Sequence, residues 1–173
     1  HVAVGMGADV TVLALNASRL AQLERAYPGK IKARLSEPLI LAEHVADADL
    51  VIGAVSIAGK QPPKLISREL LRKMRPGSVL VDVSIDQGGI AETSRPTTHS
   101  NPIYLAQGVV HYCVANMPSA VARTATLALT QATLPYVRAL AKRGLKAAVF
   151  TDPGFKNGLQ IQAGQITYKN LAE

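Results

Sequence analysis

The sequence predicts an α/β fold, a doubly wound parallel sheet of the Rossmann type that is followed by a helical tail. Between Val10 and Val114, short apolar and β-branched runs alternate with amphipathic helical stretches. This alternation is typical of parallel strands that are joined by right-handed helical crossovers. From about Ala120 the pattern becomes mainly helical, so we expect the tail to be a separate unit.

The strands and helices can be placed in order along the chain. Strands are expected over residues 10–15, 31–35, 50–55, 78–83 and 109–114. Because the third run is apolar along its whole length, we expect it to be buried on both faces of the sheet. Helices are expected over 16–28, 39–45 and 67–74, the last capped by Ser67. The tail is expected to be helical from 120 to 144 with an interruption at Pro135, and then to Phe150.

The first residues predict that the sheet is incomplete at its N-terminus. Residues 1–8 resemble the last turns of a helix, and Gly5 and Gly7 precede a strand instead of following one. A dinucleotide-binding domain normally opens with a strand and a Gly-x-Gly-x-x-Gly turn that binds pyrophosphate at a helix N-terminus. Since that motif does not occur in the sequence, we expect the first strand and the glycine loop to be missing.

Composition excludes several classes of protein. A chain of 173 residues with 48% hydrophobic and 18% charged residues has the balance of one globular domain and not of a disordered chain. Its longest apolar run, residues 50–59, is shorter than the roughly 20 residues of a membrane-spanning helix, so no membrane association is expected. The net charge is +7, but the basic residues are dispersed and no Trp is present, which argues against a nucleic-acid partner. The single cysteine, Cys113, and a start unlike a signal peptide indicate the cytoplasm.

Several segments together identify a family. Residues 83–89, followed by 92–99, strongly resemble the signature of alanine dehydrogenase, and residues 48–55, 63–65, 111–118 and 127–136 extend the match. The nucleotide-binding alpha subunit of proton-translocating transhydrogenase is similar around Asp86–Gly89 and is the related alternative. The run His111–Pro118 favours the dehydrogenase.

The resemblance implies an activity and a domain arrangement. It implies oxidative deamination of L-alanine to pyruvate and ammonia with NAD, by a cytoplasmic homo-oligomer that is usually a hexamer. Residues 1–122 match the family's nucleotide-binding domain after its glycine loop, and residues 123–173 match a tail that returns to the substrate domain. The family's catalytic histidine and its substrate-binding arginine and lysine lie outside the matched part.

Asp86 is the candidate catalytic residue. It follows a predicted strand at its carboxyl end, where ligands of open parallel sheets bind, and it matches the family's catalytic aspartate. Deamination passes through an iminium that water attacks, so a carboxylate there can orient water and stabilise positive charge. Without the surrounding motif, an aspartate before two glycines is an ordinary turn residue.

The resemblance also implies the cofactor contacts. Segment 114–117 is expected on the nicotinamide side with Asn116 as its polar contact, Val55 and Ser56 on the adenosine side, and Ser36 near the adenine. The complete set of expected cofactor-binding residues is Ala14, Arg19, Ser36, Val55, Ser56, Val83, Ser84, Ile85, Arg95, Val114, Ala115, Asn116 and Met117. No metal site is expected. His99, His111 and Cys113 are not assigned to catalysis, and His111 and Cys113 are expected in the core.

Ala14 departs from the family pattern. The family has an aspartate here that accepts both ribose hydroxyls, and this chain has Val12-Leu13-Ala14-Leu15-Asn16. Arg19 matches a basic family position near the place of a 2′-phosphate. NAD is therefore the expected cofactor, and NADP stays open as an alternative.

The leading hypothesis is the cofactor-binding portion of an alanine dehydrogenase, as a fragment or as a truncated gene product. The alternative is a non-catalytic remnant that acts as a nucleotide-binding or assembly module. A nucleic-acid binder is the weakest hypothesis.

Overall fold

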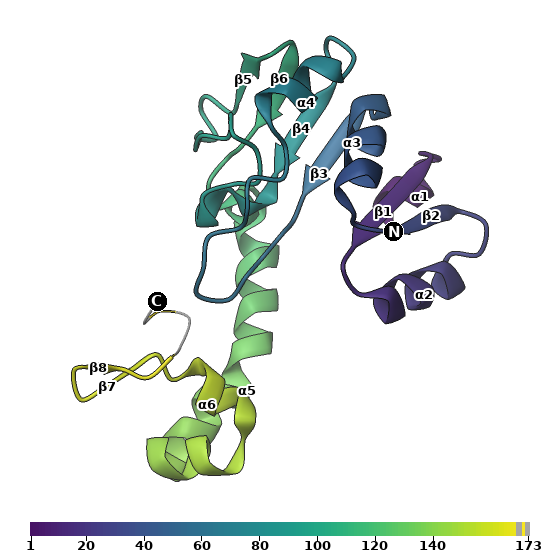
Figure 1. Ribbon diagram of the computed structural model, residues 1–173. Coiled ribbons are helices and arrows are strands. Elements are labelled where there is room, and N and C mark those ends of the chain that lie inside the picture. Colours follow the sequence, from purple (N-terminus) through teal and green to yellow (C-terminus); the bar gives the residue numbers. More distant parts are fainter. Residues whose placement is uncertain (169–170, 172–173) are drawn as a thin grey trace.

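The computed structural model describes residues 1–168 and 171, and it arranges the strands in three groups. A parallel pair contains β1 (Val10–Ala14) and β2 (Ile31–Leu35). A four-stranded sheet has the order β3 (Leu50–Gly53), β4 (Val79–Asp82), β6 (Val109–Tyr112) and β5 (Ile103–Ala106). A short hairpin contains β7 (Ile161–Gln162) and β8 (Gln165–Ile166) near the end of the chain, as Figure 1 shows.

Helices connect the parallel strands, as the alternation of patterns predicts. They are α2 (Ala17–Ala26), α3 (Pro38–Asp47) and α4 (Arg68–Lys73), and a short helix, α1 (Val2–Gly5), precedes β1. The Asn16 side chain caps α2 by accepting from the amide of Arg19, and Ser67 caps α4 by accepting from the amide of Leu70. The predicted cap at Ser67 is thus confirmed.

The core of the four-stranded sheet is a cluster of aliphatic side chains beneath α3 and α4. Ile66, Leu71, Leu80 and Val109 have almost no exposed surface, and Val45 of α3 packs against them. These residues come from a connecting loop, two helices and two strands. Burial of this apolar surface fixes the two crossover helices on one face of the sheet.

The parallel sheet is confirmed, with one strand that the sequence did not predict. β3 pairs with β4, and β4 with β6, in parallel register, but β5 runs antiparallel to β6. Gln107 and Gly108 connect β5 to β6 with φ values of 52° and 80°, as in a tight hairpin turn. β5 escapes prediction because it is short and lies within a polar, turn-rich segment.

The predicted burial of β3 on both faces is wrong. The strand ends at Gly53, and Leu50 and Ile52 are 52% and 58% exposed. Val51 packs against the core, so alternation along the strand directs Leu50 and Ile52 to the other face, which the described part of the chain leaves open.

The predicted interruption of the tail helix at Pro135 is also wrong. Helix α5 (Ala122–Thr151) continues through Pro135, and its backbone leaves the helical region at Gly144, with φ 74° and ψ 163°. Proline has a φ close to the helical value and removes one helical hydrogen bond, whereas the conformation of Gly144 cannot belong to a helix. A short helix, α6 (Pro153–Gly158), follows. In Figure 1, α5 extends away from the four-stranded sheet.

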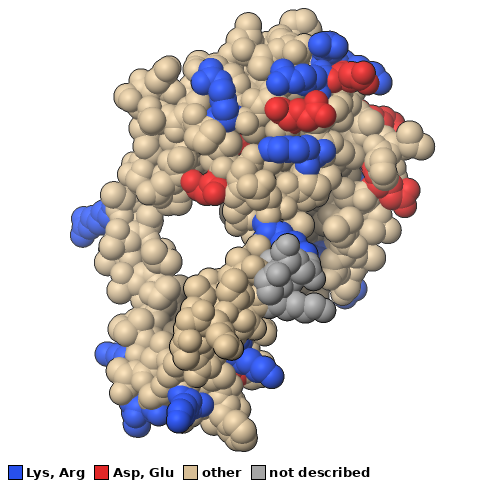
Figure 2. Space-filling model, turned by 60° about the vertical axis from the view of Figure 1, so that its left-hand side comes forward, with Lys and Arg blue, Asp and Glu red and all other residues tan. Residues whose placement is uncertain are grey.

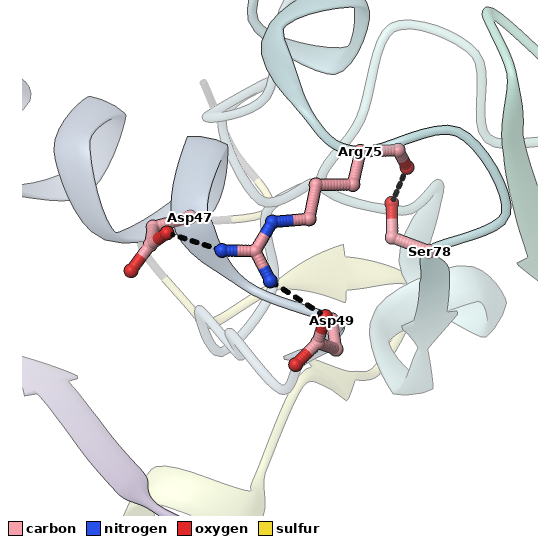
Figure 3. A network of polar contacts seen from close by, with 4 residues as sticks. All are labelled: Asp47, Asp49, Arg75 and Ser78. Atoms are coloured by element: carbon pink, nitrogen blue, oxygen red, sulfur yellow. Dashed lines mark hydrogen bonds and ion pairs between the residues drawn. The ribbon is translucent and has the colours of Figure 1, made fainter.

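A charged cluster ties the amino ends of β3 and β4 together (Figure 3). The Arg75 guanidinium bonds to Asp47 at 2.9 Å and to Asp49 at 3.2 Å, and the Ser78 hydroxyl donates to the Arg75 carbonyl oxygen at 2.7 Å. Exposed ion pairs stabilise a fold only weakly. The cluster lies before β3 and β4, at the end of the sheet opposite to their carboxyl ends.

Charged side chains of both signs share the surface. Figure 2 shows acidic and basic side chains mixed at the upper end of the molecule, whereas the lower end, formed by α5 and α6, is mainly basic. Among the described residues, no helix is both long enough and apolar enough to cross a membrane.

Candidate functional site

The carboxyl ends of β3, β4 and β6 lie at one edge of the sheet because these three strands are parallel neighbours. The chain that leaves them includes Val55 and Ser56 after β3, the 3-10 helix η1 (Val83–Gln87) after β4, and residues 113–117 after β6. Ligands of open α/β sheets bind at this edge. The structure therefore places most of the predicted site residues at the carboxyl ends of these three strands.

Asp86 and Asn116 are in direct contact. The backbone amide of Asn116 donates to the two carboxylate oxygens of Asp86, at 3.3 and 3.4 Å, and both residues are exposed. Asn116 has a left-handed backbone with φ 53°, which turns the chain out of β6 and into the 3-10 helix η2 (Met117–Val121). The predicted catalytic residue and the predicted nicotinamide-side polar contact thus form one unit.

Two contacts attach the β3 end to η1. The Ser84 hydroxyl donates to the carbonyl oxygen of Val55 and accepts from its amide, and the Gln87 side chain donates to the Ser56 hydroxyl at 3.2 Å. Ser84 and Ile85 are buried, whereas Val83 is 47% exposed. Within η1, Val83 and Asp86 are therefore the predicted site residues that a ligand can reach by side chain.

Asp82, which the sequence reasoning did not select, forms the base of this site. It is fully buried at the end of β4, and its carboxylate accepts from the amides of Ser84 and Ile90 and from the Ser94 hydroxyl. The sequence feature that could have identified Asp82 is its position as an acidic residue at the end of an apolar strand. Its partners could not be identified, because they lie two, eight and twelve residues further along the chain.

Lys64 was also not selected as a site residue. Its ammonium group donates to the carbonyl oxygens of Gly88 and Gly89, at 2.5 and 2.9 Å. Both glycines have positive φ, 107° and 75°. The Gly88–Gly89 pair is therefore a turn that glycine permits, and Lys64 fixes its carbonyl groups.

Arg95 lies on a segment that runs beside the β6 end. Thr97 donates its amide to the Cys113 carbonyl oxygen at 2.9 Å, and Ala115 donates its amide to the Thr97 carbonyl oxygen at 3.2 Å. The Arg95 guanidinium is 4.0 Å from the centre of the Tyr104 ring, a cation–π contact that orients it.

The remaining predicted residues form a second group on β1 and β2. The Ser36 amide donates to the Ala14 carbonyl oxygen at 3.0 Å, so these two residues are neighbours. Arg19 is exposed in the first turn of α2, and its guanidinium approaches the Gln22 side chain at 3.5 Å. Within residues 1–168 and 171, no strand pairing joins β1 to β3.

His111 and Cys113 are core residues, as predicted. His111 has no exposed surface and bonds to the Thr93 hydroxyl and the Val109 carbonyl oxygen, and burial lowers its pKa. Burial raises the pKa of the Cys113 thiol. Burial is also the main reason that the pKa of Tyr104 lies above its ordinary value. Exposed His99 bonds to the Ser119 hydroxyl at 2.7 Å.

An open cavity of about 450 Å³ lies beside Asp86. It is lined by residues 57–61 of the loop after β3, by residues 86–88, and by Leu171. In the part of the chain that the structure describes, no three His, Cys, Asp or Glu side chains are grouped so that they could hold a metal ion. The described residues bring backbone groups and the exposed Asp86 carboxylate to this edge of the sheet.

Comparison with known proteins gives consistent results. Residues 1–169 match the family model described as "Alanine dehydrogenase/PNT, C-terminal domain". The chain is 54% identical to alanine dehydrogenase of Halomonas elongata over 173 residues, which is 100% of this chain and 47% of that protein. It is 49% identical to alanine dehydrogenase of Bacillus subtilis over 172 residues, 99% of this chain and 46% of that protein. The chain thus spans about half the length of the curated relatives that it matches.

Solved structures give the same assignment. An L-alanine dehydrogenase superposes with a TM-score of 0.82 at 45% identity, over 98% of this chain and 47% of that one. A transhydrogenase from Sinorhizobium meliloti superposes with a TM-score of 0.67 at 26% identity, over 81% of this chain and 39% of that one. The similarity to the dehydrogenase is greater in coverage, identity and superposition.

Proposed function

The chain belongs to the family of alanine dehydrogenase and PNT C-terminal domains, and from this premise we propose that it is the cofactor-binding portion of an alanine dehydrogenase. The complete enzyme would oxidise L-alanine to pyruvate and ammonia with NAD or NADP. The observation that carries the proposal is the contact between Asp86 and Asn116 at the carboxyl edge of the sheet.

The residues at this edge suit a nicotinamide cofactor. Val55, Ser56, Val83 and Asn116 follow three neighbouring parallel strands, and an open cavity adjoins Asp86. An extended dinucleotide can lie across such strand ends and contact backbone groups. Arg95, which Tyr104 orients, adds a cation for the anionic part of the cofactor.

Asp86 is the proposed catalytic residue. When bound, the cofactor would supply the acceptor for the hydride of the alanine α-carbon. This chain's own residues would stabilise the positive charge of the imine and orient the attacking water. An exposed carboxylate at that position stabilises the cationic imine and orients the water that attacks it. The Asn116 amide fixes the direction in which the Asp86 oxygens point.

The residue that ends β1 is not acidic. Ala14 ends β1 where an acidic residue would bind the hydroxyls, and its carbonyl oxygen already accepts from Ser36. The Asn16 side-chain oxygen is occupied by the Arg19 amide. These contacts support a relaxed choice between NAD and NADP.

We further propose how the chain is divided into domains, how the protein assembles and where in the cell it is located. Residues 1–122 would form part of the nucleotide-binding domain, and residues 123–173 the tail that returns to a substrate domain. The exposed apolar residues Leu127, Leu129 and Val137 on α5 support packing against further protein, in a cytoplasmic homo-oligomer such as a hexamer. Lys169, Asn170, Ala172 and Glu173 lie outside the described residues.

A chimera tests the proposal. In it, this chain replaces the matching 47% of the Halomonas elongata alanine dehydrogenase. We expect alanine-dependent reduction of NAD or NADP, and we expect Asp86→Asn to lower kcat by about a hundredfold or more with NADH affinity changed only a few-fold. The matched control is Asp49→Asn, at the opposite edge, with nearly unchanged kcat. A chimera that binds NADH and does not oxidise alanine would contradict the proposal.

A second function is favoured by one observation. Position 14, where the family resemblance implies an aspartate, is alanine, which suits a nucleotide-binding or assembly module without activity. If the chain is such a module, the chimera should assemble and bind nucleotide but stay inactive even after Ala14→Asp.

A further inference from the structure

One buried side chain binds both ends of the loop that carries Asp86. Asp82 lies at the end of β4 and has no exposed surface. Its Oδ1 accepts from the Ser84 amide at 3.1 Å, and its Oδ2 accepts from the Ile90 amide at 2.8 Å. Because Ser84 precedes Asp86 and Ile90 follows it, a single carboxylate fixes both ends of this loop.

The two oxygens of Asp82 have separate tasks. Through Oδ1, Asp82 is the N-cap of η1, and this cap sets the direction in which the 3-10 helix leaves the sheet. Through Oδ2, it holds the chain where it returns after Gly88 and Gly89, and the Ser94 hydroxyl donates to the same oxygen at 2.5 Å. All three partners are donors, so both oxygens must be acceptors.

The packing around Asp82 permits little adjustment. A Cβ atom on Gly89 would lie 2.6 Å from Oδ2 of Asp82 and 2.6 Å from Cβ of Ser94. A Cβ atom on Gly53 would lie 2.3 Å from a side-chain carbon of Ile90. The Gly89 backbone therefore lies directly against the Asp82 carboxylate and Ser94, and the Gly53 backbone lies directly against Ile90.

We propose that Asp82 is a positioning residue, which sets the geometry of Asp86 by closing the loop of residues 84–90 on itself. It acts through η1 and touches no substrate. The link to catalysis rests on the proposed function of Asp86. The geometric relationship between Asp82 and Asp86 is independent of any activity.

The contact between Asp86 and the Asn116 amide provides a direct spectroscopic readout. In NMR spectra of the 173-residue chain, Asp86→Asn replaces the carboxylate that accepts from this amide, so the Asn116 amide signal should shift. The same substitution is then made in an Asp82→Asn background. Asparagine at position 82 keeps the size of the side chain but points an NH₂ group at donors, so one of the two fixed ends is released.

We expect the Asn116 response to Asp86→Asn to be lost in the Asp82→Asn background. It should persist in the control background Asp49→Asn, which removes an acidic residue at the opposite edge of the sheet. A residue that supports only overall stability would lower the resistance to urea and leave the Asn116 response intact, and that result would overturn the proposal. An absent response in the parent chain would also overturn it.

If Asp82→Asn prevents folding, Ser94→Ala decides the question. This variant removes one donor to Oδ2 and leaves the carboxylate in place. A smaller Asn116 response in the Ser94→Ala background supports the proposal, and an unchanged response overturns it. Because no step needs alanine or NAD, failure of the proposed function leaves this test valid.

Discussion

Ser84 and Val55 are joined by a reciprocal pair of hydrogen bonds, in which the Ser84 hydroxyl accepts from the Val55 amide and donates to the Val55 carbonyl oxygen, each at 2.8 Å. One side chain thus satisfies both backbone groups of a residue just beyond β3. The contact joins the ends of β3 and β4, 29 residues apart in the chain. It holds the expected adenosine-side segment against the segment that carries Asp86.

Ser84→Ala should therefore destabilise the fold. It leaves the amide and the carbonyl group of Val55 without this partner, and a half-buried unsatisfied group costs about 1–3 kcal/mol. Urea denaturation followed by circular dichroism measures the loss. Ser18→Ala, at an exposed serine of α2, is the control and should change the free energy of unfolding by less than about 0.5 kcal/mol. Equal effects of the two substitutions would show that the reciprocal contact contributes nothing.

Two glycines with similar φ values allow steric and conformational effects to be separated. Gly89 and Gly77 have φ values of 75° and 86°, but a Cβ atom on Gly89 would overlap Asp82 and Ser94, whereas one on Gly77 meets nothing within 4 Å. Gly77→Ala should cost about 1–2 kcal/mol for the left-handed backbone alone. Gly89→Ala should cost about 1–3 kcal/mol more, because the core around Asp82 must move. Equal losses on thermal unfolding would contradict this packing.

The free energy of unfolding should decrease at acid pH because His111 is buried. Burial lowers its pKa, so the folded chain binds fewer protons than the unfolded chain once the pH drops below about 6.5. The stability contribution of neutral His111 is therefore complete above that pH and decreases as the pH falls through the unfolded value toward the folded one. His111→Gln removes this titration, and the difference in unfolding free energy between pH 7 and pH 5 should be smaller in the variant. An identical pH dependence would show that His111 is not the group responsible.

The sequence predicted local features well and long-range ones poorly. β2 and the Ser67 cap depend on neighbouring residues, and both lie where their patterns place them. The exposure of Ile52 depends on which surfaces other elements cover, and the continuation of α5 through Pro135 depends on backbone conformation, and periodicity encodes neither. The Asp86–Asn116 contact joins residues 30 positions apart, so the motif identified its members but not their geometry.

The last prediction concerns Ala14, where the chain departs from the expected ribose-binding carboxylate. Aspartate at the end of β1 would offer two acceptor oxygens to the vicinal hydroxyls of NAD and would repel the 2′-phosphate of NADP. Each hydrogen bond to a charged acceptor contributes about 1.5–3 kcal/mol, so Ala14→Asp should raise NAD affinity by about tenfold or more. Arg19 is exposed in the first turn of α2, and we expect it to offset part of the loss of NADP affinity that the new carboxylate causes.

The chimera with the Halomonas elongata segment allows the comparison to be made in one protein. We expect Ala14→Asp to increase the ratio of kcat/KM for NAD to kcat/KM for NADP, through a lower KM for NAD and a higher KM for NADP. Leu15→Asp is the matched control. Leu15 is 85% exposed just beyond β1, so this substitution introduces the same charge one position away. It should change the ratio much less, because Leu15 lies outside β1, in the bend that follows the strand. An unchanged ratio after Ala14→Asp would show that position 14 does not face the ribose, and the proposed placement of the cofactor along β1 would then be wrong.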